Sequence, residues 1–211
     1  QQRSSAASDV YKRQGVGLAS LGNNINFLDL DENKIQNLSN KKITFYEPGL
    51  EEYFNDDETF SRMFFSSDYA SIEWQNIDIV FVCVQTPNNL ETNSVDTNFL
   101  ESAIKEINNV NNDDLVITIK STIPPYEIEK VCEKVGMDSS KLTFNPEFLR
   151  EGTAVEDFFK PDRIVLGGTN NEKLNKLKEL YTDFDCEIIT TDSISSQSVS
   201  YTHLRAHETY T

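Results

Sequence analysis

The chain has 211 residues and a formal net charge of −16 at pH 7, with 37% hydrophobic and 10% aromatic residues. This composition and length are typical of a folded globular protein with a sizeable core rather than of a disordered chain. The strong negative charge argues against nucleic-acid binding, which favours cationic proteins. We find neither an apolar run of the roughly 20 residues that cross a bilayer nor a signal-peptide pattern, so we expect a cytoplasmic protein without a membrane partner.

The three cysteines, Cys83, Cys132 and Cys186, are widely spaced along the chain. An odd number without zinc-site spacing predicts reduced thiols, no disulfide framework and no metal site. His203 and His207 have the i, i+4 spacing of metal ligands on a helix. Both histidines lie within residues 198–211, a terminal segment that we exclude from the fold prediction, so we do not expect a metal site there.

The two ends of the chain differ from its middle. Residues 1–14 are cationic whereas the middle is strongly acidic, and neither end has helix or strand periodicity. The stretches DVYKRQ and VSYTHLRAHET also resemble translated sequencing-adapter sequence. We therefore expect residues 1–14 and 198–211 to be non-native tails around a domain of residues 15–197; genuine disordered tails are the alternative.

The middle of the chain alternates between helix and strand patterns. In chain order, the expected helices are residues 15–21, 31–38 (capped by Asp31), 50–54 (after a Pro-Gly turn), 68–74, 96–108, 124–136, 150–159 and 171–184. The expected strands are residues 25–31, 63–68, 77–84, 115–120, 141–144, 163–168 and 187–192.

This alternation predicts an α/β fold with a doubly wound, mostly parallel, Rossmann-like sheet. The continuous apolar run IDIVFVCV at residues 77–84 suits a strand that is covered on both faces. The stretch QQRSSAASDVYKR is not strand-like, so the first strand of such a fold is missing or replaced. Ligands of such sheets bind at the carboxyl ends of the strands.

Gly15, Gly17 and Asp29 have the character of a dinucleotide site. Glycines at a helix N-terminus allow close approach of a pyrophosphate, and an acid at the end of the second strand binds ribose hydroxyls. An acid there favours NAD over NADP, because it repels a 2′-phosphate. An ordinary loop and a strand-end acid would give the same short pattern.

Three further motifs follow predicted strands. VQTP follows residues 77–84, where a ligand site and a plain turn are equally compatible with the residues. In KSTIPP, Ser121 and Thr122 can cap the following helix, or hold a water or a cofactor. Glu147 and Glu151 would share one face of a helix and suit general base chemistry, although a solvated charged helix has the same spacing.

The motifs YEPGLEE, VQTP, KSTIPP and NPEFLREGTAVEDFFKPDRIV occur in this order and at characteristic intervals. Residues 15–197 thereby resemble the N-terminal half of the UDP-glucose/GDP-mannose dehydrogenase family, closest to its UDP-glucose branch. The resemblance implies NAD as cofactor, used twice in succession, and a UDP-sugar whose C6 alcohol is oxidised to a carboxylate. It also implies that the full-length protein is a homodimer or larger.

The resemblance also implies roles for individual residues. It implies that the cofactor contacts Val16, Gly17, Asp29, Lys34, Val84, Gln85, Thr86, Pro87, Ser121 and Glu151. It implies catalytic roles for Thr122, which would position a water, for Glu147 as general base or acid, and for Glu151 between cofactor and substrate. It implies that the substrate contacts Glu147, Phe148, Leu149 and Arg150.

The chain departs from the family pattern at three places. It lacks the first strand with its two glycines, the lysine and asparagine of the central helix, and the G-x-C-x-P-K-D segment that carries the nucleophilic cysteine. We therefore expect a fragment that does not complete the reaction alone. The alternatives are a GDP-mannose or UDP-N-acetylhexosamine dehydrogenase, a non-catalytic nucleotide-binding Rossmann module, and a Rossmann oxidoreductase acting on a hydroxy acid, against which NPEFLREG argues.

Overall fold

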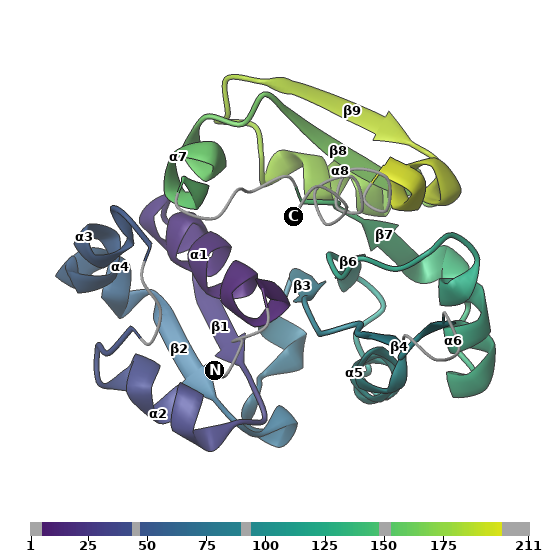
Figure 1. Cartoon of the computed structure of the whole chain (residues 1–211), viewed down its shortest axis with the longest axis horizontal. Helices are drawn as coiled ribbons and strands as arrows, with labels where there is room; N and C mark the ends of the chain where they lie inside the picture. Colours follow the sequence, from purple (N-terminus) through teal and green to yellow (C-terminus); the bar gives the residue numbers. More distant parts are fainter. Residues whose placement is uncertain (1–5, 44–46, 90–93, 148–152, 200–211) are drawn as a thin grey trace. The chain divides into compact units, whose positions relative to one another are not determined.

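The computed structural model describes residues 6–43, 47–89, 94–147 and 153–199 (Figure 1). It divides into two compact units, each of which contains two stretches of chain. The first unit comprises Gln1–Glu73 and Leu149–Pro161, and the second unit comprises Trp74–Phe148 and Asp162–Thr211. We describe each unit separately.

The first unit contains a two-stranded parallel sheet with short helices around it. Its elements are α1 (Ala6–Ser20), β1 (Ile25–Leu28), α2 (Glu32–Ser39), α3 (Leu50–Asn55), α4 (Asp57–Ser61), β2 (Met63–Ser66), the 3₁₀ turn η1 (Tyr69–Ser71) and α7 (Ala154–Phe159). β1 and β2 pair in parallel, from Ile25 opposite Met63 to Leu28 opposite Ser66. Apolar side chains of α1, β1 and α3, among them Val16, Phe27 and Phe54, form its core.

The second unit contains the larger sheet, whose strand order is β3-β6-β7-β8-β9. Its strands are β3 (Ile79–Val82), β6 (Val116–Ile119), β7 (Leu142–Phe144), β8 (Arg163–Gly168) and β9 (Glu187–Thr191), with a small antiparallel pair β4 (Asn88–Asn89) and β5 (Ser94–Val95) beside them. Its helices are α5 (Asn98–Asn108), α6 (Glu127–Val135) and α8 (Asn171–Glu179), with the 3₁₀ turns η2 (Trp74–Asn76) and η3 (Ser139–Lys141).

Strand direction changes once within the larger sheet. β3, β6 and β7 are parallel, β8 runs antiparallel to β7, and β9 is parallel to β8. The chain leaves the second unit after β7 and returns at β8, so it enters the sheet from the edge where β7 ends. The carboxyl ends of β3, β6 and β7 therefore share one edge, to which β8 contributes its amino-terminal half.

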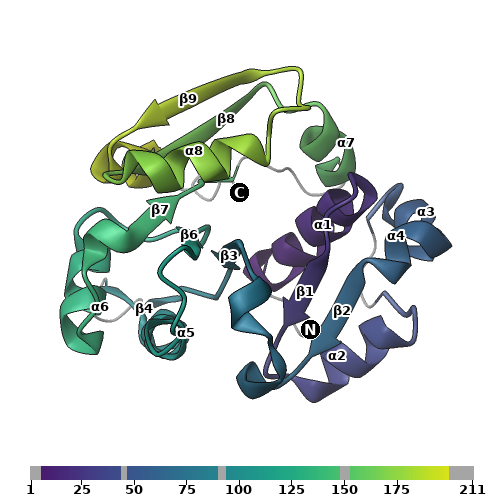
Figure 2. The ribbon, with the colours of Figure 1, turned by 180° about the vertical axis from the view of Figure 1, so that it is seen from behind.

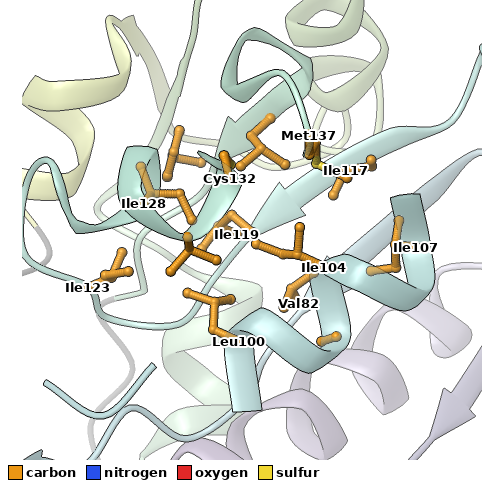
Figure 3. Close-up of a cluster of buried hydrophobic side chains, with 14 of the residues drawn as sticks. Val82, Leu100, Ile104, Ile107, Ile117, Ile119, Ile123, Ile128, Cys132 and Met137 are labelled. Carbon is orange, nitrogen blue, oxygen red and sulfur yellow. The ribbon is translucent and has the colours of Figure 1, made fainter. Parts of the chain in front are cut away.

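Helices cover both faces of this sheet, as the alternation of side chains along a strand requires. On β6, Ile117 and Ile119 face α5 and α6, where they pack with Leu100, Ile104 and Ile128 (Figure 3). Val116 faces the other side and packs with Leu174 and Leu177 of α8, which lies along β8 in Figure 2. The apolar runs of the sequence thus fill two cores at once, which is the pattern that a strand buried on both faces predicts.

The α/β class and the mostly parallel sheet are confirmed, but several boundaries differ from the predictions. Two 3₁₀ turns replace the helix expected at residues 68–74, and the β4–β5 pair was not predicted. α6 begins at Glu127 rather than at residue 124, because the two prolines precede a residue in the left-handed region. Its predicted stop is confirmed, since Gly136 ends α6 with φ of 71°. Asp31 caps α2 as predicted, accepting hydrogen bonds from the backbone N–H groups of Asn33 and Lys34.

We expect the backbone at Tyr126 to be strained, since this exposed residue has φ of 69° at the start of α6. A side chain in the left-handed region costs roughly 1–2 kcal/mol, and glycine avoids that cost. Tyr126→Gly should therefore have a free energy of unfolding about 1 kcal/mol higher than Tyr126→Ala, measured by urea denaturation. Tyr126→Ala is the matched control because it removes the same ring but keeps the Cβ atom. Equal stability of the two variants would contradict the strain.

Candidate functional site

The carboxyl edge of β3, β6 and β7 gathers three of the predicted motifs. VQTP follows β3, KSTIPP begins where β6 ends, and the NPE triplet at residues 145–147 follows β7. Parallel pairing places these three strand ends side by side, and the backbone N–H of Asn145 donates to the carbonyl of Ile119 at 3.0 Å. The motifs are therefore neighbours in the second unit although some 60 residues separate the first from the last.

Side-chain hydroxyls join the loop after β3 to the loop after β6. Ser121 Oγ accepts a hydrogen bond from the Val84 N–H (2.8 Å) and donates to the Val84 carbonyl (2.7 Å). Thr86 Oγ1 donates to the carbonyl of Thr122 (2.6 Å). The structure thus brings together the predicted residues Val84, Thr86, Ser121 and Thr122, with Gln85 and Pro87 in the same turn. The expectation that Ser121 or Thr122 caps α6 is wrong, because α6 begins at Glu127 and its N-cap residue Tyr126 makes no side-chain capping hydrogen bond.

A buried polar network lies beneath these loops, on the α8 face of the sheet. Lys120 Nζ donates to the backbone carbonyl (3.2 Å) and to Oδ1 (2.9 Å) of Asn145. The Tyr181 hydroxyl donates to the same Oδ1 at 2.7 Å, and Asn145 Nδ2 donates to the carbonyl of Val165 in β8 at 3.0 Å. Lys120, Asn145 and Tyr181 are all buried. The network fixes the backbone at the end of β7, directly before the predicted catalytic Glu147.

Glu147 lies in an irregular segment after β7 rather than in a helix, so the expectation of a shared helix face with Glu151 is wrong. The described helix α7 begins at Ala154, and the buried Asn145 and Pro146 lie between the end of β7 and Glu147. Both carboxylate oxygens of Glu147 are inaccessible to solvent. The carboxylate interacts electrostatically with Lys120, Cys83 and Tyr181. The predicted residues Phe148, Leu149, Arg150 and Glu151 lie outside the described residues.

The thiol of Cys83 belongs to this same edge. Burial raises the pKa of Cys83 from 9.0 to about 12; the ammonium of Lys120 opposes this rise and the carboxylate of Glu147 adds to it. Burial likewise raises the pKa of Cys132 to about 11. The thiolate is the nucleophilic form of cysteine, so Cys83 is poorly suited to nucleophilic attack despite its position. All three cysteines are free thiols, as predicted.

Asp29 and Lys34, in the first unit, lie together at the carboxyl end of β1. Asp29 follows the last strand residue, and its Oδ2 lies 3.4 Å from Lys34 Nζ in the first turns of α2. Both side chains are partly accessible to solvent. An acid at this place can accept hydrogen bonds from ribose hydroxyls, so this part of the unit fits the adenosine end of a dinucleotide.

Val16 and Gly17 are not placed at a helix N-terminus, where their backbone N–H groups could bind a phosphate. α1 begins at Ala6, so both residues lie in its interior, with their neighbours bonded along the helix. A Cβ atom at Gly17 would overlap the Phe158 ring, so this glycine permits α1 to pack against α7. The residues before Gly15 continue the helix where the predicted fold has a strand and a loop, and this geometry does not fit a bound pyrophosphate.

The segment predicted to be a non-native tail contributes to the buried structure of the first unit. Arg13 Nε lies 3.0 Å from Glu47 Oε2, and both side chains are almost fully buried. The other oxygen of Glu47 accepts a hydrogen bond from the Ala154 N–H at 2.9 Å, where α7 begins. Glu47 of the YEPGLEE motif thereby holds α7 to this unit. His203 and His207 lie outside the described residues.

Other kinds of site find little support in the described ranges. A cavity of about 10 Å³ adjoins Lys120, Ser121 and Gln197, which is room for one water molecule and not for a cofactor. Among the residues with described positions, His, Cys, Asp and Glu form no group of three that could hold a metal ion. Within the same ranges, no helix combines the length and the apolar character that a membrane crossing requires.

Sequence reasoning missed Lys120, Asn145 and Tyr181, which support the edge in the second unit, and Glu47, which holds α7 in the first unit. A signal was present for two of them. A lysine that closes the apolar strand LVITIK, and an asparagine before Pro146, are polar residues at positions where burial is expected. Glu47 belongs to the YEPGLEE motif, which was noted without a role for this acid, and nothing near Tyr181 distinguishes it from an ordinary residue of an amphipathic helix.

Comparison with known proteins gives consistent matches over nearly the whole chain. The sequence model of the UDP-glucose/GDP-mannose dehydrogenase family, NAD binding domain, matches residues 10–185. The chain is 38% identical to UDP-glucose 6-dehydrogenase of Rickettsia bellii over 192 residues, which are 89% of this chain and 44% of that protein. It is 32% identical to UDP-glucose 6-dehydrogenase TuaD of Bacillus subtilis, covering 89% of this chain and 41% of that protein. The chain thus spans less than half the length of these curated relatives.

Solved structures agree with this result. A UDP-glucose dehydrogenase from Pyrobaculum islandicum is 30% identical, with a TM-score of 0.79 over 91% of this chain and 46% of that one. A GDP-mannose dehydrogenase from Pseudomonas aeruginosa, solved as a ternary complex, shares the fold with a TM-score of 0.83 over 95% of this chain and 48% of that one, at 23% identity. These matches confirm the resemblance found in the sequence, the fold class, and NAD as the cofactor of the matched domain.

The raised pKa predicts that Cys83 is slow to alkylate in the folded protein. A shift from 9.0 to about 12 lowers the thiolate fraction at pH 8 about a thousandfold. Iodoacetamide labelling followed by peptide mass spectrometry should therefore modify Cys83 much faster in urea than in the folded chain. Cys186 is half-buried like Cys83, but burial raises the pKa of its thiol less, so it serves as the internal comparison and should react first. Native Cys83 reacting as fast as in urea would contradict the burial of its thiol.

Proposed function

Since this chain belongs to the UDP-glucose/GDP-mannose dehydrogenase family, we propose that it is the cofactor-binding half of an NAD-dependent nucleotide-sugar 6-dehydrogenase. The proposed substrate is UDP-glucose, whose C6 alcohol is oxidised to the carboxylate of UDP-glucuronate in two hydride transfers. The relatives from Rickettsia bellii and Bacillus subtilis reported above are named UDP-glucose 6-dehydrogenases, which favours this sugar nucleotide over the other members of the family. A homodimeric or larger assembly of the full-length protein stays a prediction.

The observation that carries the proposal is the position of Glu147. Glu147 follows β7 at the carboxyl edge of the sheet. The loops that contain Val84, Thr86 and Ser121 follow β3 and β6 at the same edge. Oxidation of an alcohol needs a base that accepts the hydroxyl proton, and a carboxylate at a strand end can supply it. NAD supplies the hydride acceptor when it is bound.

Residues of the loops after β3 and β6 hold this edge in one conformation and position a water molecule. Ser121 holds the backbone of Val84, and Thr86 holds the backbone of Thr122, so the two loops keep one conformation against which a cofactor can bind. We assign to Thr122 the positioning of a water for the second oxidation, in line with the resemblance. The proposed substrate contacts of Phe148, Leu149 and Arg150, and the role of Glu151, rest on the resemblance alone.

Asp29 supports NAD as the preferred dinucleotide. A carboxylate at the end of β1 accepts hydrogen bonds from ribose hydroxyls and repels a 2′-phosphate. Lys34, 3.4 Å from this carboxylate, orients it. The interior position of Gly17 in α1 does not fit a bound pyrophosphate, so we assign no cofactor contact to the backbone of Val16 or Gly17 in this conformation.

The second oxidation needs a nucleophile, which the resemblance identifies as a cysteine. None of Cys83, Cys132 and Cys186 matches the motif of that cysteine, and burial raises the pKa of all three thiols. We therefore assign the thioester step to no residue of this chain. The expectation that the 211-residue chain alone forms no UDP-glucuronate stays a prediction.

Cofactor binding tests the proposal by isothermal titration calorimetry of the 211-residue chain. NAD should bind more tightly than NADP, and Asp29→Asn should weaken NAD binding about tenfold, the loss of one or two hydrogen bonds to a charged acceptor. Asp57→Asn is the matched control, since Asp57 carries the same charge on an exposed side chain of the same unit. Saturable binding of a different nucleotide with no response to NAD would favour the non-catalytic nucleotide-binding module.

A further inference from the structure

Lys120 is a lysine in a place where lysines are rare. It is 7% exposed, follows the last residue of β6, and lies on the α8 face of the sheet, with its ammonium 5.5 Å from the centre of the Phe81 ring. A buried ammonium is costly unless acceptors surround it. The described contacts of Lys120 Nζ are two oxygens of a single residue, Asn145.

Asn145 is fixed in turn from several sides. Its side chain accepts from Lys120 and Tyr181 and donates to the Val165 carbonyl, while its backbone N–H donates to the Ile119 carbonyl. Each of these hydrogen bonds restrains the chain two residues before Glu147. The direction in which Glu147 leaves the sheet therefore depends on a network that Lys120 anchors.

Lys120 also interacts electrostatically with the carboxylate of Glu147. Three ionisable side chains interact with Lys120 or with one another at this edge, namely Glu147, Cys83 and Tyr181. The thiol and the phenol are neutral hydrogen-bonding groups at ordinary pH, because burial raises the pKa of both. Of these four side chains, Lys120 is the base and Glu147 is the carboxylic acid, so their ionised forms carry opposite charges.

We propose that Lys120 is a positioning residue for Glu147: it fixes the backbone at Asn145 and supplies the buried positive charge that holds the carboxylate ionised and in place. Burial lowers the pKa of Lys120, and the carboxylate of Glu147 is the main influence that raises it again. An ionised carboxylate is what proton abstraction requires. The role of Glu147 as a base rests on the proposed function, whereas the interaction between Lys120 and Glu147 does not depend on it.

The pairing can be tested in the 211-residue chain without substrate or cofactor. Lysine labelled with ¹³C at Cε reports the pKa of Lys120 through its chemical shift, assigned with Lys120→Arg. In Glu147→Gln the pKa of Lys120 should fall by about one unit or more, because an opposite charge close by has been removed. Glu133→Gln, which removes the same charge from an exposed position on α6, should leave it unchanged.

A folded Glu147→Gln chain in which Lys120 titrates as in the parent would overturn the pairing. The positioning role has a second readout, hydrogen exchange of the Asn145 amide. Lys120→Met should accelerate this exchange at least tenfold, and Lys120→Arg should restore part of the protection because it keeps the charge and the donors. Equal protection in all three chains would overturn the anchoring role. If Lys120→Met does not fold, the lysine titration in Glu147→Gln still tests the charge pairing, and the Asn145 amide exchange in Lys120→Arg, compared with the parent chain, still tests the anchoring; neither measurement requires NAD.

Discussion

The ammonium of Lys120 lies where the three parallel strands β3, β6 and β7 end. The conformation of the chain at this edge depends on the hydrogen-bond acceptors that surround this buried charge. Asn145 provides both acceptors, and the same residue bonds to β6, to β8 and to Tyr181 after α8. A half-satisfied buried network is less stable than an apolar core, whereas a satisfied one specifies a single arrangement. This network therefore does more than stabilise the sheet, because it determines where the polypeptide departs toward Glu147.

The antiparallel pairing of β7 and β8 brings a strand of the sheet within hydrogen-bond distance of this network. Because β8 returns from the edge where β7 ends, the middle of β8 lies beside Asn145 and presents the Val165 carbonyl to its side chain. A parallel β8 would place a different part of the strand at this edge. The loops after β3 and β6, joined by Ser121 and Thr86, complete an edge rich in polar groups above two apolar cores.

The sequence predicted the parts of the structure that local patterns determine. Apolar runs such as residues 115–120 gave the strands, and Asp31 and Gly136 marked a helix start and a helix stop correctly. It failed where distant residues decide the conformation. The position of Glu147 depends on Asn145 and the sheet rather than on helical spacing, and the start of α1 depends on residues that continue the helix ahead of Gly15. The contacts of Lys120 depend on strand register, which periodicity alone does not set.

We infer that the carboxyl edge of β3, β6 and β7 is the functional edge of the second unit. Amide chemical-shift mapping during an NAD titration of the ¹⁵N-labelled chain tests it most directly. We expect saturable shifts at Val84, Thr86 and Ser121, with little change in α8, which covers one face of the sheet. Saturable binding that leaves these three amides unperturbed, or shifts confined to other elements of the second unit, would contradict it.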